Sequence, residues 1–208
     1  ERHTGRSTFP REMEGQPVGA YLLITLDSDS EDQLYTLLEQ AAELVLDAGA
    51  MDVLVADSPA KMRDAWAARS AFLEVIMEET KLLDECDVVV PVTKIASYLE
   101  FVNKTGEECG LVIRSFGHAG DGNLHIYECS NDLTEEEFKK RVDKFFDLIY
   151  KEASAQGGLV SGEHGIGSGK IQYLVESIGE TNMALMEGIK RVFDPKMILN
   201  PGKVCYRL

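Results

Sequence analysis

The sequence predicts an α+β fold, in which antiparallel strands are covered on one face by helices and the chain ends in a helical segment. Three observations lead to this class. Short apolar runs of strand length alternate with longer stretches whose apolar residues recur at helical spacing. Two of the short runs flank one glycine-rich turn, as the strands of a hairpin do. Neither an internal repeat nor a low-complexity segment interrupts this order.

The first half of the chain alternates between apolar runs and amphipathic stretches. The predicted strands are Val18–Leu26, Met51–Ala56 and Asp87–Val92. The predicted helices are Glu31–Ala48, Ser58 to about Leu83, and Ile95–Glu108. Pro59 suits the first turn of its helix, Gly110 ends the third helix, and Pro91 favours a sheet edge or a strand end.

The second half opens with the hairpin and then becomes helical. Its predicted strands are Leu111–Phe116 and Leu124–Cys129. A long helix follows over Thr134–Gln156, begun by the capping box T-E-E-E. After a glycine-studded loop, the expected elements are helices over Ile171–Ser177 and Thr181–Phe193, and a tail from Asp194 to Leu208.

Composition and charge exclude several classes of protein. The net charge of −15 repels phosphate backbones, so a nucleic-acid partner is not expected. No run of about 18 apolar residues predicts a membrane span, and no signal peptide opens the chain. The four cysteines lack metal-site spacing and are expected to be reduced thiols of a cytoplasmic protein. Residues 1–17 lack an apolar period and are expected to be a linker or a loose entry to the fold, and the initial Glu1 indicates a trimmed chain.

The first segment that carries potentially reactive side chains is GHAGDGNLH, from Gly117 to His125. Asp121-Gly122 between two strands is a strong hairpin signal. Pairing about that centre sets His118 opposite His125 on one face, with Cβ atoms about 5 Å apart. Two imidazoles at that separation could share one metal ion, although a pair of surface histidines beside a turn fits the spacing equally well.

The second segment is SGEHGIGSGK, from Ser161 to Lys170. It does not match a phosphate-binding P-loop, which would need glycine at His164 and a hydroxyl residue at Ile171. Its glycines would instead let the backbone approach a ligand closely, while Glu163 and His164 supply a carboxylate and an imidazole.

The two segments together provide three histidines and a glutamate. Two imidazoles and a carboxylate form a zinc site with an open fourth position, as in catalytic zinc sites. The remaining histidine would then be available for acid–base work near neutral pH. The set favours an enzyme. Two other classes stay open: a flavin-independent metal hydrolase, and a non-catalytic metal-binding or assembly module.

Three motifs in one order resemble a known family: GHAGDGNLH, then EHGIG, then the tail DPKMILNPGK. This combination resembles the C-terminal domain of FAD-linked oxidases of the vanillyl-alcohol oxidase type. The nearest branches are D-lactate dehydrogenases, glycolate oxidase FAD subunits and D-2-hydroxyglutarate dehydrogenases. The likeness runs from about Val18 onward, so residues 18–208 are expected to be the substrate and metal domain, and residues 1–17 the linker from an N-terminal FAD domain.

The resemblance implies a ferredoxin-like antiparallel sheet and a set of residue roles. The positions that match metal ligands, usually of zinc, are His118, His125 and Glu163. The position of the base that takes the substrate hydroxyl proton is His164. The resemblance further implies substrate contacts from Asn123 and from Arg69, which would grip the substrate carboxylate, and a place near the flavin ring for Asn200.

The resemblance also implies the reaction, which is oxidation of a D-2-hydroxy acid to the 2-oxo acid with FAD as the hydride acceptor. Leu73 and Glu85 stand where the hydroxyglutarate branch has Thr and Lys, so an acid of lactate or glycolate size is expected. Most of the FAD would lie on the other domain, and this chain alone would be inactive. Electrons would pass to an electron-transferring flavoprotein, an iron–sulfur subunit or quinone.

Overall fold

The computed structural model describes residues 9–205, and the chain divides into two compact units. The first unit extends to Val75 and the second begins at Ile76. The predicted linker lies in part outside the described residues; within it, the two-residue strands β1 (Glu12–Met13) and β2 (Gln16–Pro17) pair as a small antiparallel hairpin. No described helix is both long enough and apolar enough to cross a bilayer.

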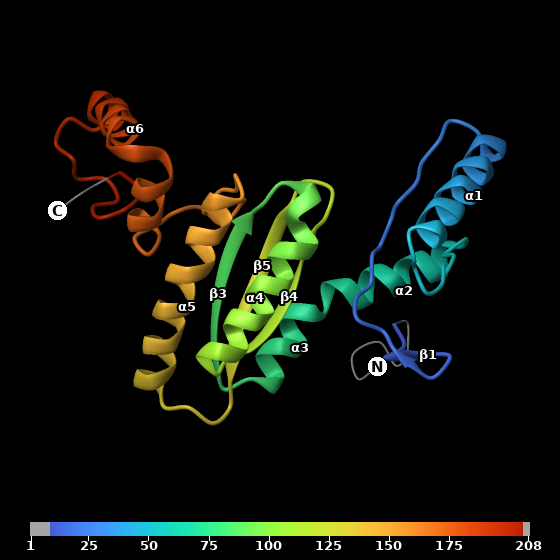
Figure 1. The fold of residues 1–208 in the computed structure, drawn as a ribbon. Helices are drawn as coiled ribbons and strands as arrows, with labels where there is room; N and C mark the ends of the chain where they lie inside the picture. The colour runs from blue at the N-terminus through green and yellow to red at the C-terminus, as the bar shows by residue number, and fades with distance from the viewer. Residues whose placement is uncertain (1–8, 206–208) are drawn as a thin grey trace. The chain divides into compact units, whose positions relative to one another are not determined.

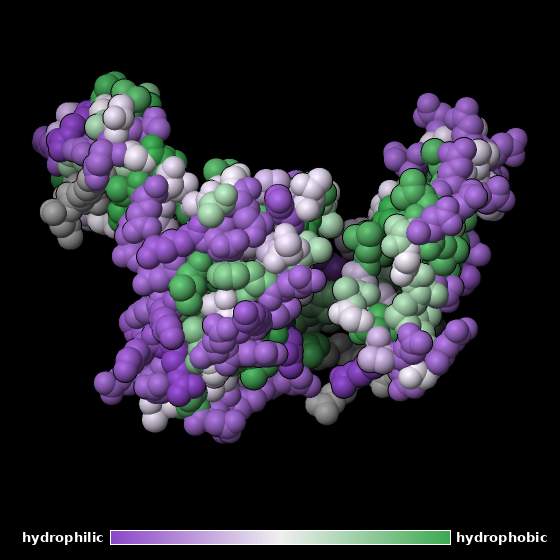
Figure 2. Space-filling model, in the orientation of Figure 1, coloured by the Kyte–Doolittle hydropathy of each residue, from purple (hydrophilic) through white to green (hydrophobic). Residues whose placement is uncertain are grey.

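Two of the predicted strands are wrong. Residues 18–26 and 51–56 are not strands: neither belongs to a sheet in the described part of the chain, although the Val18 amide donates to the Arg11 carbonyl beside the small hairpin. Their apolar side chains are mostly exposed, including Leu22 and Leu54, and Figure 2 shows apolar atoms at the surface of this unit. An apolar run predicts burial, but a strand also requires a hydrogen-bonded neighbour, which such a run does not specify.

The helices of the first unit begin where their caps predict. Helix α1 (Glu31–Asp47) starts after Ser30, whose side chain accepts a hydrogen bond from the Gln33 amide. Helix α2 (Pro59–Ser70) starts after Ser58 in the same way, with proline in its first turn.

The prediction of a single helix from Ser58 to about Leu83 is also wrong, because the structure has two shorter helices there. Helix α2 ends at Ser70, and α3 (Phe72–Glu79) ends three residues before strand β3 (Leu82–Val89). The Asn131 amide donates to the Glu79 carbonyl and accepts from the Lys81 amide, which terminates α3 and directs the chain into the sheet. A contact 50 residues away in the chain therefore sets this boundary.

The second unit contains a three-stranded antiparallel sheet in the order β3-β5-β4. Its other strands are β4 (Val112–His118) and β5 (Asn123–Ser130). Helix α4 (Ile95–Cys109) follows β3 after a short 3₁₀ turn, and helix α5 (Glu135–Ala155) follows β5. Beyond α5, Leu159 makes an isolated antiparallel bridge to Val89. The resulting β-α-β-β-α-β order is ferredoxin-like, which confirms the predicted class.

Helices α4 and α5 cover one face of this sheet (Figure 1). The core between them is apolar and closely packed: its fully buried members include Cys86, Val88, Tyr98, Val102, Ile126, Phe145 and Ile149. Gly110, at φ 67°, ends α4, and the Thr134 hydroxyl accepts from the Glu137 amide at the start of α5. Both boundaries agree with the sequence prediction within two residues.

The chain after α5 returns to β3 and then becomes helical. Gly158 lies so close to the Val89 carbonyl that a Cβ there would be 2.2 Å from the oxygen. The bridge at Leu159 and the loop that follows therefore run along the edge of β3. Helix α6 (Ile171–Phe193) contains a kink at Gly179, which divides it as the sequence predicts.

Candidate active site

The hairpin brings His118 and His125 to one face of the sheet. Its register pairs Phe116 with His125 and His118 with Asn123. The predicted direct pairing of His118 with His125 is therefore wrong, because the register is shifted by two residues. Because alternate residues share a face, the imidazoles remain diagonal neighbours, with ring centroids 6.0 Å apart.

The register differs because the turn has four residues instead of two. The His118 carbonyl accepts from the Gly122 amide at 3.0 Å, and Asp121 Oδ1 accepts from the Asn123 amide at 3.0 Å. Gly122 has φ 78°, and a Cβ there would be 1.9 Å from the Val90 carbonyl oxygen. The Asp-Gly pair thus forms the second half of a tight turn whose backbone is packed against the end of β3.

The loop after Leu159 is held by one buried carboxylate, Asp87 on β3. Asp87 Oδ2 accepts hydrogen bonds from the Ser161 hydroxyl at 2.8 Å, the Gly162 and Glu163 amides at 3.0 Å, and the His164 amide at 2.8 Å. Burial acts to raise the pKa of Asp87, but these donors outweigh it and hold the pKa below its usual value. The loop conformation follows from an ionised carboxylate that gathers successive N–H groups.

Gly162 lets this loop lie directly against Asn123. A Cβ at Gly162 would be 2.5 Å from Asn123 Oδ1 and 2.6 Å from its Cγ. Asn123 is buried, and its Oδ1 has no hydrogen-bond partner among the described residues. An unused buried acceptor beside the histidines is a feature expected where a polar ligand binds.

The hairpin and the loop together form a cluster of imidazoles and carboxylates. Glu163 Oε1 lies 2.9 Å from His125 Nε2, and the His125 and His164 ring centroids are 4.8 Å apart. His118, His125 and Glu163 each offer one ligand atom, and these atoms lie within 4.8 Å of one another. Two imidazole nitrogens and one carboxylate oxygen at this separation match the donor set of a divalent cation such as zinc.

Glu85, which in the sequence indicated only the size of the substrate, is also a member of the cluster. Its Oε1 lies 3.4 Å from His125 Nδ1 and 3.3 Å from His164 Nδ1, and it forms with these histidines a second group spaced for a cation. Both Glu85 Oε1 and His125 Nδ1 are buried without a hydrogen-bond partner in the described part of the chain. The strand alternation places Glu85, Asp87 and His125 on one face, which is the signal that could have identified Glu85.

His164 is more accessible to solvent than the neighbouring His125. Its side chain is 42% exposed, whereas that of His125 is 6% exposed. Its Nδ1 faces Glu85, as the ring nitrogen of a general base often faces a carboxylate that orients it. The cluster thus contains one buried imidazole and one accessible imidazole.

Two predicted site residues lie outside this cluster. Arg69 is half-buried on α2 in the first unit, so its contact with a substrate carboxylate stays a prediction. Asn200 is exposed, with φ 46°, in a turn of the tail. Asp194 holds that turn by accepting from the Ile198 and Leu199 amides. The predicted place of Asn200 near a flavin also stays a prediction.

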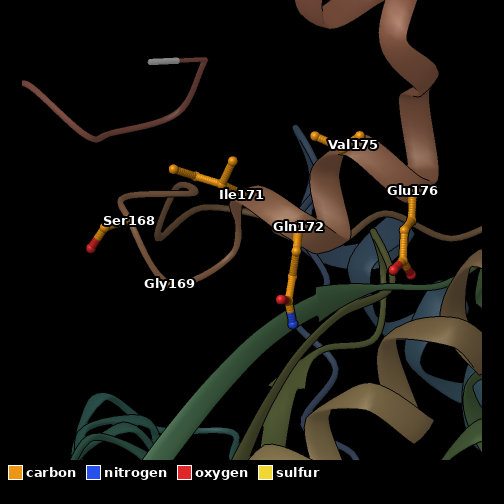
Figure 3. A pocket seen from close by; sticks show the side chains of 6 residues that line it. All are labelled: Ser168, Gly169, Ile171, Gln172, Val175 and Glu176. Atoms are coloured by element: carbon orange, nitrogen blue, oxygen red, sulfur yellow. The ribbon is translucent and has the colours of Figure 1, made fainter. Parts of the chain in front are cut away.

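An open cavity of about 520 Å³ lies at the start of α6 and not at the cluster. It is lined by Ser168, Gly169, Ile171, Gln172, Val175 and Glu176. Figure 3 shows Gln172 and Glu176 on one side of the helix and Ile171 and Val175 on the other. The lining includes no imidazole and one carboxylate, so the reactive groups of the chain lie elsewhere, in the cluster.

Comparison with known proteins is consistent with this arrangement. The chain is 58% identical to a D-lactate dehydrogenase of Anaerostipes hadrus, over all of this chain and 44% of the relative. It is 36% identical to a D-lactate dehydrogenase of Archaeoglobus fulgidus, over all of this chain and 43% of the relative. It is 31% identical to the glycolate oxidase subunit GlcD of Bacillus subtilis, over 91% of this chain and 40% of the relative.

The chain spans less than half the length of these relatives. Residues 4–204 match the model of one protein family, described as FAD linked oxidases, C-terminal domain. The chain therefore belongs to the family of C-terminal domains of FAD linked oxidases.

Proposed function

We propose that this chain is the substrate- and metal-binding domain of a flavin-dependent dehydrogenase that oxidises a D-2-hydroxy acid to the 2-oxo acid. The observation that carries the proposal is the convergence of His118, His125 and Glu163 from two separate segments, with His164 beside them. The names of the relatives, D-lactate dehydrogenase and glycolate oxidase subunit, support the substrate class.

The residues that would hold a divalent cation are His118, His125 and Glu163. Their donor types fit zinc, and the unpartnered His125 Nδ1 and Glu85 Oε1 beside them are buried polar atoms that a charged or hydrogen-bonding ligand would satisfy. When bound, such a cation would act as a Lewis acid that lowers the pKa of the substrate hydroxyl. With three protein ligands, a coordination position stays open for the substrate.

His164 would take the proton from the substrate hydroxyl. The carboxylate of Glu85 faces its Nδ1, so the proton of the neutral imidazole is expected on Nδ1 and Nε2 is left to accept the substrate proton. Loss of this proton leaves an alkoxide at C2, from which a hydride can depart to a suitable acceptor. The flavin of the complete protein supplies that acceptor.

The acidic surroundings of the histidines support a substrate with one carboxylate. Glu85 and Glu163 both face the imidazoles, so a second substrate carboxylate would be repelled at this place. Arg69 would grip the single carboxylate of the substrate, and Asn123, whose buried Oδ1 is unused, would contact the substrate beside it. An acid of the size of lactate or glycolate satisfies these requirements.

The rest of the protein would carry most of the FAD. The relatives are more than twice as long as this chain, which leaves room for a separate flavin domain. Asn200 would contribute a contact near the flavin ring from the tail. An electron-transferring flavoprotein, an iron–sulfur subunit or quinone would accept the electrons, and a cytoplasmic location is expected from the sequence.

The test is turnover by the full-length protein with D-lactate, glycolate and D-2-hydroxyglutarate, measured with an artificial electron acceptor. We expect D-lactate or glycolate to give the highest kcat/KM, and His164→Ala to lower kcat by about 10²–10⁴-fold because a general base is lost. Bound zinc, manganese or cobalt should change little in that variant, since His164 is not among the three proposed ligands.

A matched variant, His118→Ala, should lower both bound metal and turnover. Equal loss of metal in His164→Ala would make this histidine a structural residue or a ligand. Turnover of none of the three acids, with flavin bound, would contradict the proposed substrate class. Ester or amide hydrolysis by a flavin-free preparation would favour the metal hydrolase instead.

A further inference from the structure

Asp87 is fully buried, yet its carboxylate does not face the cluster as a ligand would. Four donors are directed at it: the Ser161 hydroxyl and the amides of residues 162–164. Oδ2 accepts from all four donors at 2.8 to 3.0 Å, and Oδ1 shares the Gly162 amide at 3.1 Å. Asp87 belongs to neither group of side chains spaced for a cation, and its hydrogen bonds go to the loop backbone and Ser161.

The place of Asp87 in the sheet links the two segments of the site. It is the direct cross-strand neighbour of His125, so it stands on the same face beside the buried imidazole. The Val89–Leu159 bridge brings the loop to the edge of β3 two residues further along the strand. The loop then meets Asp87 through three consecutive amides, two of which belong to Glu163 and His164.

We propose that Asp87 is the positioning residue of the site, which fixes the backbone of Glu163 and His164 so that their side chains meet His125. This inference rests on the proposed function, since it assigns a role toward the cation and the base. The loop contains Gly162 and Gly165 and has no helix or strand of its own. By accepting hydrogen bonds from its amides, Asp87 holds this glycine-rich backbone in one conformation.

Two neighbours of Asp87 reinforce these contacts. Ser161 donates to Asp87 Oδ2 and accepts from the Gly165 amide at 2.9 Å, so it closes the loop on itself. Lys170 donates to the Asp87 backbone carbonyl at 3.3 Å, and its ammonium lies 3.9 Å from Oδ2. The loop is thus tied to β3 at both of its ends and at its centre.

The experiment compares the full-length wild type with Asp87→Asn and with Asp84→Asn as the matched control. Asp84 is an exposed aspartate of the same strand on the opposite face of the sheet. Two quantities are measured: amide hydrogen exchange of peptides covering residues 161–165, and the affinity for Zn²⁺ alone. An amide group in place of the carboxylate removes the negative charge that the loop donors face, and it replaces one carboxylate oxygen with an N–H donor group.

For Asp87→Asn we expect loop exchange to be faster by about tenfold or more, because the loop opens locally. We expect Zn²⁺ affinity to fall by about 10–100-fold, as it does when residues that orient metal ligands are changed. Asp84→Asn should change neither quantity. If Asp87→Asn does not fold, Ser161→Ala is measured instead. We then expect faster loop exchange and weaker Zn²⁺ binding, both by smaller factors.

Unchanged loop exchange and unchanged Zn²⁺ affinity in folded Asp87→Asn would overturn the positioning role and leave the proposed cation site intact. Loss of stability with wild-type Zn²⁺ affinity would also overturn it, since Asp87 would then be merely structural. Absence of Zn²⁺ binding in all three proteins would overturn the cation site itself and this inference with it.

Discussion

Two fully buried carboxylates lie on neighbouring strands of one sheet and behave in opposite ways. Asp87 on β3 faces the loop, where four donors and Lys170 surround it. Glu128 on β5 faces the helix-covered side, and neither of its oxygens has a hydrogen-bond partner among the described residues. Burial, followed by the charge of Asp84, raises the pKa of Glu128 well above its usual value, whereas the pKa of Asp87 is lowered.

The difference shows that burial alone does not decide the charge of a carboxyl group in this fold. The solvent exposure of the two side chains is the same, and the number of N–H and O–H donors within reach differs. The pKa of a buried carboxyl group is lowered where backbone amides replace water, and it is raised where apolar side chains do. The first arrangement organises the site, and the second is a cost to the stability of the core.

Asp87→Asn should cause the largest loss of stability. Three backbone amides and the Ser161 hydroxyl would lose a charged, fully buried acceptor, so we expect the free energy of unfolding to fall by about 3 kcal/mol. The measurement is urea-dependent hydrogen exchange of peptides from β3 and β5 in the full-length protein. A loss below about 0.5 kcal/mol would contradict the view that the donors, and not burial, determine the state of Asp87.

Glu128→Met should raise the free energy of unfolding, whereas Asp87→Asn should lower it. The carboxyl group ionises near its usual pKa of 4.5 in the unfolded chain, but stays protonated to higher pH in the folded chain. Wild-type stability therefore falls as the pH rises through the window between these two pKa values. The methionine variant lacks this penalty, so we expect a gain of about 2 kcal/mol at pH 8 and little gain at pH 4.

The same exchange measurement at both pH values checks the Glu128 prediction. Loss of stability in Glu128→Met at every pH would mean that the carboxyl group has a partner, and the contrast with Asp87 would then fail.

Gly162→Ala tests whether the site depends on close approach of the loop. The added Cβ would be 2.5 Å from Asn123 Oδ1, so either the loop or Asn123 must shift. We expect a loss of stability of about 1–2 kcal/mol and weaker Zn²⁺ binding. Gly169→Ala in the same loop is the control, since a Cβ there meets nothing within 4 Å. Equal effects of both variants would show a general need for flexibility.

Lys170→Met should have the smallest effect and separates two sources of stabilisation at Asp87. The ammonium is 3.9 Å from Oδ2, while the amides and the Ser161 hydroxyl are at hydrogen-bond distance. Since the substitution also removes the hydrogen bond from the ammonium to the Asp87 backbone carbonyl, we expect a loss of about 1 kcal/mol in the free energy of unfolding, measured as above. A loss as large as that of Asp87→Asn would make the ion pair, and not the donors, the dominant partner.

The elements that depend on local chemistry could be predicted from the sequence. Helix α5 begins after Thr134, and α4 ends at Gly110, because a side-chain cap and a left-handed glycine act within one turn of the helix. The hairpin and the kink in α6 follow from glycines in the same way.

The elements that depend on contacts with residues far away in the chain could not be predicted from the sequence. The end of α3 is set by Asn131, and residues 18–26 have the composition of a strand without a described partner. The register of the hairpin differs from the prediction because the turn packs against the Val90 carbonyl, a contact that spacing does not reveal.

The histidines and the glutamate of the proposed site lie in recognisable motifs, but the residues that position them do not. His118, His125, Glu163 and His164 could be identified from sequence, and the structure brings them together. Asp87 and Glu85 lie on β3, before helix α4 and the hairpin, and belong to neither motif. Their importance follows only from the pairing of β3 with β5 and from the bridge at Leu159.

The most direct test of the account is the metal content of the full-length protein and its His125→Ala variant, purified from cells supplied with zinc, manganese and cobalt. His125 lies at the centre of both groups of potential ligands. The account predicts about one equivalent of a divalent cation in the wild type and less than a tenth of that in the variant, because one of three protein ligands is lost. A wild type without bound metal, or a variant that retains it fully, would contradict the account.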